Sequence, residues 1–291
     1  ANAAQIEAVA WDGDPLSLYR ATADGEVDIC FGSEDMWMSL NPAYGLFASP
    51  PGGLTAGEFE GWIAWGGGGD VWRALAGEAG VAPYMIGDQG FSPTLTANKY
   101  DAIDLPNLTV AATGLAADVW RTAGAKAVVD DLSTPGLAVA NGSDAISAFE
   151  AAPGAFAARY STMVSHVNNA MSMNVNLASL SRLSDADRKV LEIAANAEHI
   201  QQRGDALTRS MAASAPGGAI AGLPVVETPN GLLTALLFAS SAVLETVGGH
   251  DRLASDAVWS YQLHSEDAAA WSAIGEGAFL EARARATGAA Q

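Results

Sequence analysis

Short apolar segments alternate with segments of helical periodicity along the first half of the chain. Apolar runs at 6–11, 27–31 and 83–86 predict strands, and the segment 16–23 behind Pro15 predicts a helix. The glycine run 66–69 divides a further helical segment into two helices around a hinge. Strands that alternate with helices favour βαβ crossovers and parallel sheets. The sequence therefore predicts an α/β fold.

The second half of the chain continues this alternation and then becomes mainly helical. Further strands are predicted at 108–112, 127–129, 170–177 and 225–226. Further helices are predicted at 116–123, 144–152, 156–164, 188–213, 232–247 and 254–285. No low-complexity linker separates these segments, so two α/β lobes that share strands are expected instead of two independent domains.

The charge balance of the chain limits its partners. There are 33 Asp and Glu against 14 Lys and Arg, a formal net charge of -19, with 49% hydrophobic and 16% charged residues. This composition excludes an intrinsically disordered chain. An acidic surface repels phosphate backbones and anionic headgroups, so neither nucleic acid nor a membrane surface is an expected partner. Cys30 is the only cysteine, which excludes an intrachain disulfide and a cysteine metal cage.

Two segments bear on membranes and targeting. The apolar helix predicted at 232–247 contains Thr234 and Glu245 and is shorter than the roughly 20 apolar residues that span a bilayer. Residues 1–5 contain no basic segment and no apolar segment, so any signal peptide is expected to have been removed from this sequence.

Catalytic motifs are absent from the sequence. The four histidines form no HExxH motif, and the chain has no phosphate-binding loop and no GxSxG elbow. A non-enzyme without cofactor or metal is therefore expected. A hydrolase with paired carboxylates is the alternative, and it requires two of these carboxyl groups to lie within about 5 to 10 Å. The candidates are Asp12, Asp14, Glu34, Asp35 and Asp88.

Aromatic and small polar residues gather at the predicted strand ends, where open α/β sheets place their ligands. The residues at these ends are Trp11, Phe31, Ser33, Trp37, Asp88, Gln89, Phe91 and Thr113. His166, Asn168 and Asn169 precede the returning strand and are expected to close over the same ligand. Each of these residues, taken alone, also fits packing or turn formation.

The order of several motifs resembles the extracytoplasmic solute-binding proteins of tripartite ATP-independent periplasmic (TRAP) transporters, the DctP-like family. The similar stretches are 8–15, 19–29, Trp37 with 41–47, 67–72, 105–110, and 175–176 with 183–191. Among them, Trp37 with NPAYGLF at 41–47 is similar to a segment of the keto-acid and chloroaromatic branch, and 67–72 resembles a helix of the family. The resemblance covers about residues 6 to 200.

The resemblance implies a two-lobed binding protein with a long C-terminal helix, which captures a small organic solute and passes it to a membrane permease. It implies a periplasmic location, and a homodimer through the C-terminal helix is one expectation. The chain begins where the family's second strand is expected, so the usual first strand and helix are expected to be missing. The expected division is 1–86 with 177–216 for the N-terminal lobe, 87–176 with 217–250 for the C-terminal lobe, and 251–291 for a helical segment across both.

The resemblance also implies a different grip on the ligand. The family holds its ligand carboxylate with an Arg, and Ala111 occupies that position here. Aromatic faces and carboxylates remain, and they suit an amine or quaternary ammonium, a polyol, or an aromatic ring. Closure of the lobes is expected to use hinges near 87–90 and 174–178. The alternative is a binding fold that acts as a sensor or partner-docking subunit and carries no solute.

Overall fold

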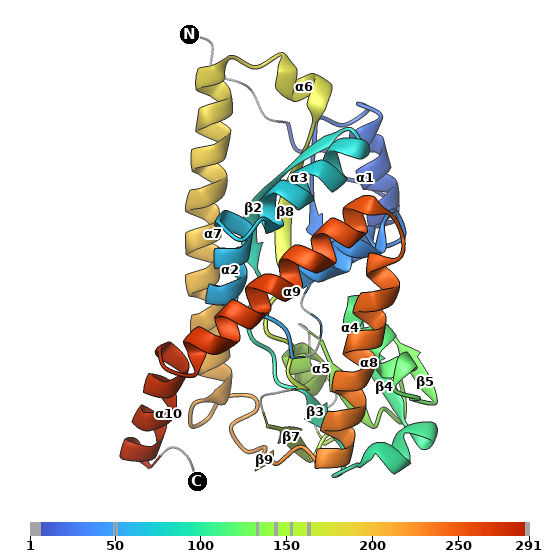
Figure 1. Cartoon of the computed structure of the whole chain (residues 1–291), viewed down its shortest axis with the longest axis vertical. Coiled ribbons are helices and arrows are strands. Elements are labelled where there is room, and N and C mark those ends of the chain that lie inside the picture. Colours follow the sequence, from blue (N-terminus) through green and yellow to red (C-terminus); the bar gives the residue numbers. More distant parts are fainter. Residues whose placement is uncertain are drawn as a thin grey trace.

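A computed structural model describes residues 7–48, 50, 52–131, 134–142, 145–151, 154–161 and 164–288. The chain forms an elongated molecule with one sheet in each half (Figure 1). The α/β prediction is confirmed, and strand pairing divides the molecule into two lobes.

The first lobe contains a three-stranded sheet in the order β1-β8-β2. Its strands are β1 (Ile29–Ser33), β8 (Ala170–Asn176) and β2 (Val81–Asp88). The central strand β8 is antiparallel to both neighbours, so this sheet departs from the parallel pairing expected of βαβ units. The pairing also places residues 170–176 with the first lobe, although 87–176 are expected in the second.

The second lobe contains a six-stranded sheet in the order β5-β4-β6-β3-β7-β9. The strands are β3 (Leu95–Thr96), β4 (Thr109–Ala112), β5 (Ala127–Val129), β6 (Val139–Asn141), β7 (Ala158–Tyr160) and β9 (Val225–Val226). β4 pairs in parallel with β5 and β6, as predicted, whereas β3 is antiparallel to β6 and β7. The chain crosses between the lobes after β2 and returns before β8.

Helices surround both sheets. In the first half of the chain these are α1 (Pro15–Ala23), α2 (Ala56–Ala64), α3 (Gly68–Glu78), α4 (Gly114–Thr122), α5 (Ala145–Ala151) and the 3-10 segments η1 (Glu34–Trp37), η2 (Pro42–Ala48) and η3 (Ala102–Asn107). In the second half they are α6 (Leu177–Ser181), α7 (Asp185–Ser214), α8 (Asn230–Gly248), α9 (Arg252–Ser272) and α10 (Glu276–Thr287). The predicted division into two helices at the glycine run is confirmed, with Gly67 at the N-cap of α3.

Three predicted elements differ in the structure. The strand predicted at 6–11 is irregular over the described residues 7–11. The helix predicted at 156–164 is wrong, because β7 occupies part of it and pairs with both β3 and β9. The single helix predicted at 254–285 is divided at Gly275, whose φ of -102° and ψ of -126° lie outside the helical region.

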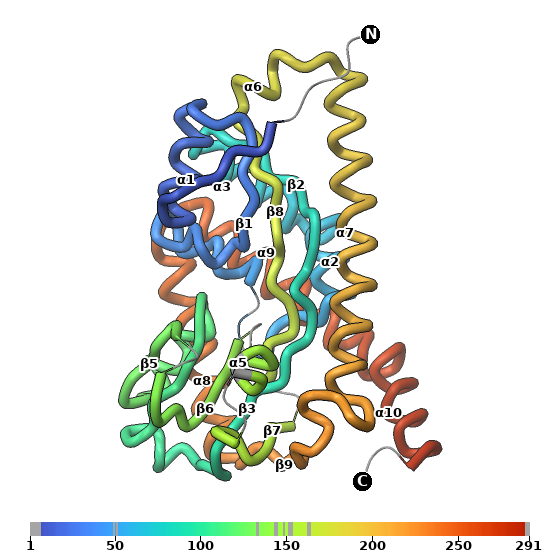
Figure 2. Tube along the Cα trace, turned by 180° about the vertical axis from the view of Figure 1, so that it is seen from behind, coloured from blue at the N-terminus to red at the C-terminus, as the bar shows by residue number. Residues whose placement is uncertain are grey.

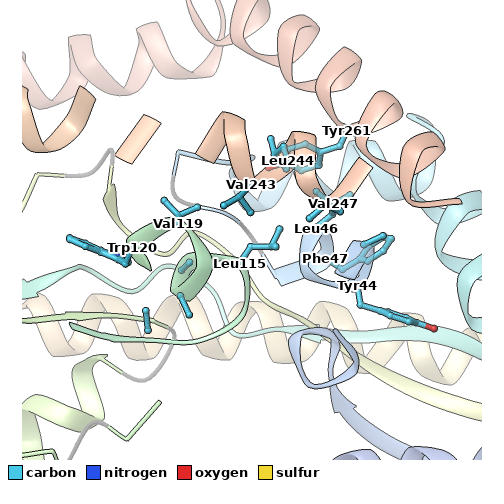
Figure 3. Close-up of a cluster of buried hydrophobic side chains, with 14 of the residues drawn as sticks. Tyr44, Leu46, Phe47, Leu115, Val119, Trp120, Val243, Leu244, Val247 and Tyr261 are labelled. Atoms are coloured by element: carbon cyan, nitrogen blue, oxygen red, sulfur yellow. The ribbon is translucent and has the colours of Figure 1, made fainter. Parts of the chain in front are cut away.

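One hydrophobic core runs through both lobes. Figure 3 shows side chains from η2, α4, α8 and α9 meeting, among them Phe47, Leu115, Val243 and Tyr261. The Phe47 ring stacks between the indoles of Trp62 and Trp72, with centroids 5.1 and 5.2 Å away. The shared core fixes the two lobes against each other on the side of α8 and α9.

The two helices α8 and α7 differ in how they pack: α8 lies in the core, and α7 lies along the edge of the molecule. α8 is long and apolar enough to cross a membrane, but in this structure seven of its side chains are buried, where it packs against α4 and α9. α7, of 30 residues, packs along β2 and follows the molecule at its edge from one lobe to the other (Figures 1 and 2). Its first turn is set by Ser184, whose Oγ accepts a hydrogen bond from the Asp187 backbone N–H at 3.2 Å.

Candidate functional site

The two crossing segments lie side by side where the lobes meet. Ser92 and His166 form an isolated antiparallel bridge, with backbone N–H to carbonyl distances of 2.8 and 3.0 Å. The Gln89 N–H donates to the Asn169 carbonyl at 3.1 Å. We call the polar side chains that these segments bring together with η1 the lobe junction; they are Asp35, Asp88, Ser92, Ser165, His166, Asn168 and Asn169.

Asp88 ends β2 and anchors the lobe junction. One carboxylate oxygen, Oδ1, accepts hydrogen bonds from the backbone N–H groups of Gly90 at 2.8 Å and Asn169 at 3.0 Å. Its own N–H donates to Gln202 Oε1 of α7 at 2.7 Å. Burial raises the pKa of the Asp88 carboxyl, and the two backbone donors oppose that rise. The second oxygen, Oδ2, is buried and has no hydrogen-bond partner among the described residues.

Asp35 enters the lobe junction from η1 of the first lobe. The Asn169 side-chain amide donates to Gln89 Oε1 at 3.2 Å and, at a longer 3.4 Å, to Asp35 Oδ1, which also accepts from Ser33 Oγ. Gly114 begins α4 of the second lobe with a φ of +56°, and a Cβ there would lie 3.0 Å from the Asp35 Cβ. Only glycine fits this contact without strain. The two lobes are therefore closed against each other at this point.

The lobe junction holds an unusual number of buried polar atoms without partners. In the described part of the chain they are Asp88 Oδ2, Ser92 Oγ, Ser165 Oγ, His166 Nε2, Asn168 Oδ1 and Asn169 Oδ1. Buried polar atoms in folded proteins nearly always have a partner, because an unmet one costs about 1 to 3 kcal/mol. Six such atoms on the two crossing segments point to a bound polar molecule or water that meets them.

The lobe junction is acidic and short of cations. Burial lowers the pKa of His166 to about 4, partly opposed by Asp35, so its imidazole is neutral at pH 7. His199 and Arg203 of α7 act on Asp88 only through their field, since both bind Glu60 directly. Among the described residues, no Lys or Arg side chain donates a hydrogen bond to a junction side chain. Such a site favours a ligand that brings donors or positive charge.

A second buried carboxyl, Glu34, lies directly before Asp35 and is fully enclosed. It accepts hydrogen bonds from Trp72 Nε1 at 2.9 Å and from Ser172 Oγ, and the Trp37 indole faces it without a well-aligned bond. Burial raises the pKa of Glu34 to about 8, against the effect of these donors. Both of its oxygens already have partners, so we assign Glu34 to the support of η1.

Of the site residues predicted from the sequence, the polar ones lie in or near the lobe junction, and most of the aromatic ones do not. The structure brings Ser33, Asp88, His166, Asn168 and Asn169 into or beside the lobe junction, with Gln89 between them. Asn168 is held by a hydrogen bond from its amide to the Leu54 carbonyl at 2.6 Å. Thr113 is exposed, and it directly precedes the Gly114 contact.

The predicted aromatic faces around the ligand need correction. Trp11 is 38% exposed and donates to Ser17 Oγ at 3.0 Å beside α1, and the side chains of Phe31 and Phe91 are 59% and 42% exposed. Trp37 alone is buried, and it packs on Tyr19 with ring centroids 4.5 Å apart. The aromatic residues therefore do not form an enclosing cage.

Sequence reasoning missed three contributors to this site. Ser92 and Ser165 flank the strand crossing in segments without a distinctive pattern, and Gln202 lies on a helix more than one hundred positions from Asp88. Asp35, one of the carboxylates that the sequence offers to a ligand, shares Asn169 with Asp88. In the described part of the chain, no three His, Cys, Asp or Glu side chains are grouped to hold a metal ion.

Two surface cavities lie elsewhere. One of 520 Å³ is lined by residues 99–101, Asp104 and 227–231, at η3 and the start of α8. The other, of 380 Å³, is lined by Pro50, Ser240, Tyr261 and their neighbours. Neither is lined by a residue of the lobe junction.

Comparison with known proteins supports the fold. No family model and no curated protein matches this chain. Among solved structures, it is similar to a TRAP periplasmic solute-binding protein from Colwellia psychrerythraea with bound calcium and pyruvate, at 17% identity and a TM-score of 0.79 over 91% of this chain and 84% of that chain. A TRAP transporter solute-binding protein from Bordetella bronchiseptica RB50, with calcium and picolinate, has 19% identity and a TM-score of 0.76 over 94% and 84%.

A solved structure with lower similarity to this chain holds a different ligand. The TRAP periplasmic solute-binding protein from Chromohalobacter salexigens, with bound (S)-(+)-2-amino-1-propanol, has 15% identity and a TM-score of 0.67 over 86% of this chain and 81% of that chain. Likeness at these identities establishes architecture. The chain has the two-lobed α/β fold of the TRAP periplasmic solute-binding proteins.

Proposed function

We propose that this chain is the extracytoplasmic solute-binding subunit of a TRAP-type transporter, and that its solute binds at the lobe junction. The fold supports the transport class, and the six unpartnered buried atoms support the place of binding. In this proposal the protein works in the periplasm, and its macromolecular partner is the membrane permease of the same transporter.

The chemistry of the lobe junction favours an amine or amino alcohol as the solute. Among the described residues, none donates to Asp88 Oδ2, Asn168 Oδ1 or Asn169 Oδ1, and Asp35 adds a second carboxylate. A buried charge is stable only when it is paired, so an ammonium group would meet these atoms better than a carboxylate would. Ala111, fully buried in β4, has no group that could hold a ligand anion. Ser92 and Ser165 hydroxyls would orient a hydroxyl of the solute.

Capture by lobe closure follows from where the site lies. Gly90, with a φ of +77°, lies on one crossing segment beside the irregular register between Met85 and Gly87. The second crossing lies at 164–169, because Asn174 is paired within the first sheet to Cys30 and Pro83. We therefore place the second hinge before β8 instead of at 174–178. The bound solute would hold the crossing segments together.

A thermal-shift panel tests the proposal. Primary amines and amino alcohols (propylamine, ethanolamine, 2-amino-1-propanol) should raise the melting temperature of the purified chain, whereas pyruvate, acetate and glycerol of similar size should not. Stabilisation at a ligand concentration of 100 times Kd corresponds to about 2.7 kcal/mol. Asp88→Asn should abolish the shift, and Asp12→Asn, an exposed carboxylate next to α1, should leave it intact.

Other outcomes would contradict the proposal. A shift with pyruvate alone would oppose the amine assignment, and a shift with calcium chloride alone would indicate a metal site at these oxygens. No shift with any solute class would remove the support for solute capture. A shift with amines that survives Asp88→Asn would place the binding site away from the lobe junction.

A further inference from the structure

α7 exposes a continuous apolar stripe on the face turned away from the protein. Its large members are Val190 at 63% exposed, Ile193 at 57%, Ile200 at 72%, Leu207 at 62% and Met211 at 64%. The buried residues of the same helix, Ala195 and Ala206, lie on the opposite face and pack toward β2. Both views of the molecule show α7 at its margin (Figures 1 and 2).

The spacing of this stripe is that of a coiled-coil seam. The exposed residues at 190, 193, 197, 200, 204, 207 and 211 alternate steps of three and four over about 30 Å of helix. We call these seven positions the α7 seam. A strict three-four alternation is what a second helix requires, because each side chain must enter a gap on the facing helix. A broad apolar groove imposes no such spacing.

The charges around the α7 seam favour a second copy of this chain as the partner. The flanking positions Ala194, Asn196, Gln201, Thr208 and Ser210 are uncharged, and the other two are cations with partners in the same chain: Lys189 binds Glu192 and Arg203 binds Glu60. Two chains with a net charge of -19 repel each other over most of their surfaces, and here they would meet without a carboxylate beside the seam. A membrane surface fits poorly, since interfacial helices have a basic polar face and α7 has mixed charges.

The sizes of the seam side chains specify an antiparallel pair. Ala197 and Gly204 alternate with Ile193, Ile200 and Leu207, and no heavy atom lies within 4 Å of a Cβ built on Gly204. In an antiparallel pair Ile193 would face Gly204 of the second copy and Ala197 would face Ile200, so that the central large residues meet small ones, and Val190 would face Leu207 at each end. A parallel pair would place Gly204 against Gly204 and leave voids, which packed interfaces avoid.

We propose that the chain forms a two-fold symmetric dimer through antiparallel pairing of the α7 seam. The five large side chains expose roughly 500 to 600 Å² in each copy, so their burial alone would remove about 1,100 Å², close to the lower limit for a stable interface. α7 turns Gln202 toward Asp88 of the lobe junction, on a face of the helix different from the seam. The proposal does not depend on the identity of the solute.

Sedimentation velocity of the full chain over about 1 to 100 μM tests the dimer. Ile200→Lys places one positive charge from each chain near the centre of the helix pair, and it should raise the dimer Kd by about 100-fold or more. Phe238→Lys on α8, at a side chain 75% exposed, is the matched control and should leave the Kd unchanged. Circular dichroism of each variant reports folding. A wild-type chain that stays monomeric throughout this range overturns the proposal.

Two further results would also overturn it. A dimer that survives Ile200→Lys but is lost with Phe279→Lys would lie at α10, where the C-terminal-helix homodimer was expected. Orientation is read by disulfide trapping in a Cys30→Ser background. A mixture of Ile193→Cys and Gly204→Cys chains should cross-link, and Ile193→Cys alone should not; cross-linking of Ile193→Cys alone would show a parallel pair.

Discussion

At the scale of single residues, the account depends on what burial does to polar side chains. Glu34 and Asp88 are both buried carboxyls, but their hydrogen-bond partners differ. Both Glu34 oxygens accept hydrogen bonds, while Asp88 satisfies one oxygen and leaves the other open. This difference separates a supporting carboxyl from one that can meet a ligand.

Glu34→Gln should change the pH dependence of stability. The folded-state pKa of about 8 lies above the unfolded value of 4.5, so the folded state holds a proton that the unfolded state releases. Stability should therefore fall as pH rises from about 4.5 to 8, by an amount on the order of 4 kcal/mol. Urea unfolding across this range should show the fall in the wild type and a flatter profile in Glu34→Gln.

The control for this experiment is Glu78→Gln, at an exposed position of α3. It should reproduce the wild-type profile. A Glu34→Gln profile that falls as steeply as the wild type between pH 5 and 8 would show that Glu34 is ionised in the folded chain.

The sequence predicts some junction residues for a physical reason and misleads on others. Asp88 ends a strand and His166 to Asn169 precede one, so the strand-end rule finds them. The same rule fails for Phe31 and Phe91. The register of a strand decides which face of the sheet each side chain lies on, and that register depends on partners distant in the sequence. Gln202 is a polar residue on a long helix, and only packing brings it to Asp88.

At the scale of elements, patterned segments are predictable and short strands are not. The long helices α7 and α8 follow from periodicity and capping, and β4 and β5 from their apolar runs. β7 has three residues and owes its conformation to β3 and β9, so no local signal identifies it. The antiparallel placement of β8 between β1 and β2 is likewise a long-range outcome.

Gly45→Ala tests the packing of η2 on α4, which joins the lobes. A Cβ at Gly45 would lie 2.5 Å from Leu115 Cγ and 2.9 Å from Met38 Sδ, both too close for contact. Overpacking of this kind costs about 1 to 3 kcal/mol. Chemical denaturation should therefore show a loss of stability in this range.

Gly57→Ala provides the comparison at the start of α2, where no heavy atom lies within 4 Å of an added Cβ. Alanine is the better helix former, and this variant should gain up to about 1 kcal/mol. Equal stability of the Gly45→Ala chain and the wild type would contradict the tight contact between η2 and α4.

At the scale of the whole molecule, the core shared by the two lobes governs how they can move, and the net negative charge governs how stability depends on salt. The core shown in Figure 3 continues from η2 through α4 to α8 and α9, so the lobes are joined on one side and meet at polar groups on the other. Opening of the lobes would then be a rotation about the crossing segments that keeps the α8 and α9 contacts. The sequence predicts the two lobes, whereas the core that they share is seen only in the structure.

The net charge of -19 predicts a salt effect on stability. Self-repulsion among 33 acidic side chains is screened over a distance of about 10 Å at 0.1 M salt and about 3 Å at 1 M. The melting temperature should rise as sodium chloride is increased from about 0.02 to 0.5 M. A melting temperature that falls over this range would show that attractive ion pairs outweigh the repulsion.

The crystal structure of the chain with 2-amino-1-propanol tests solute capture at the lobe junction most directly. We expect its ammonium nitrogen within hydrogen-bonding distance of Asp88 Oδ2 and an Asn168 or Asn169 Oδ1 atom, with its hydroxyl at Ser92 or Ser165. Density for the solute in the 520 Å³ cavity beside η3, or a junction still without a ligand at saturating solute, would contradict the account.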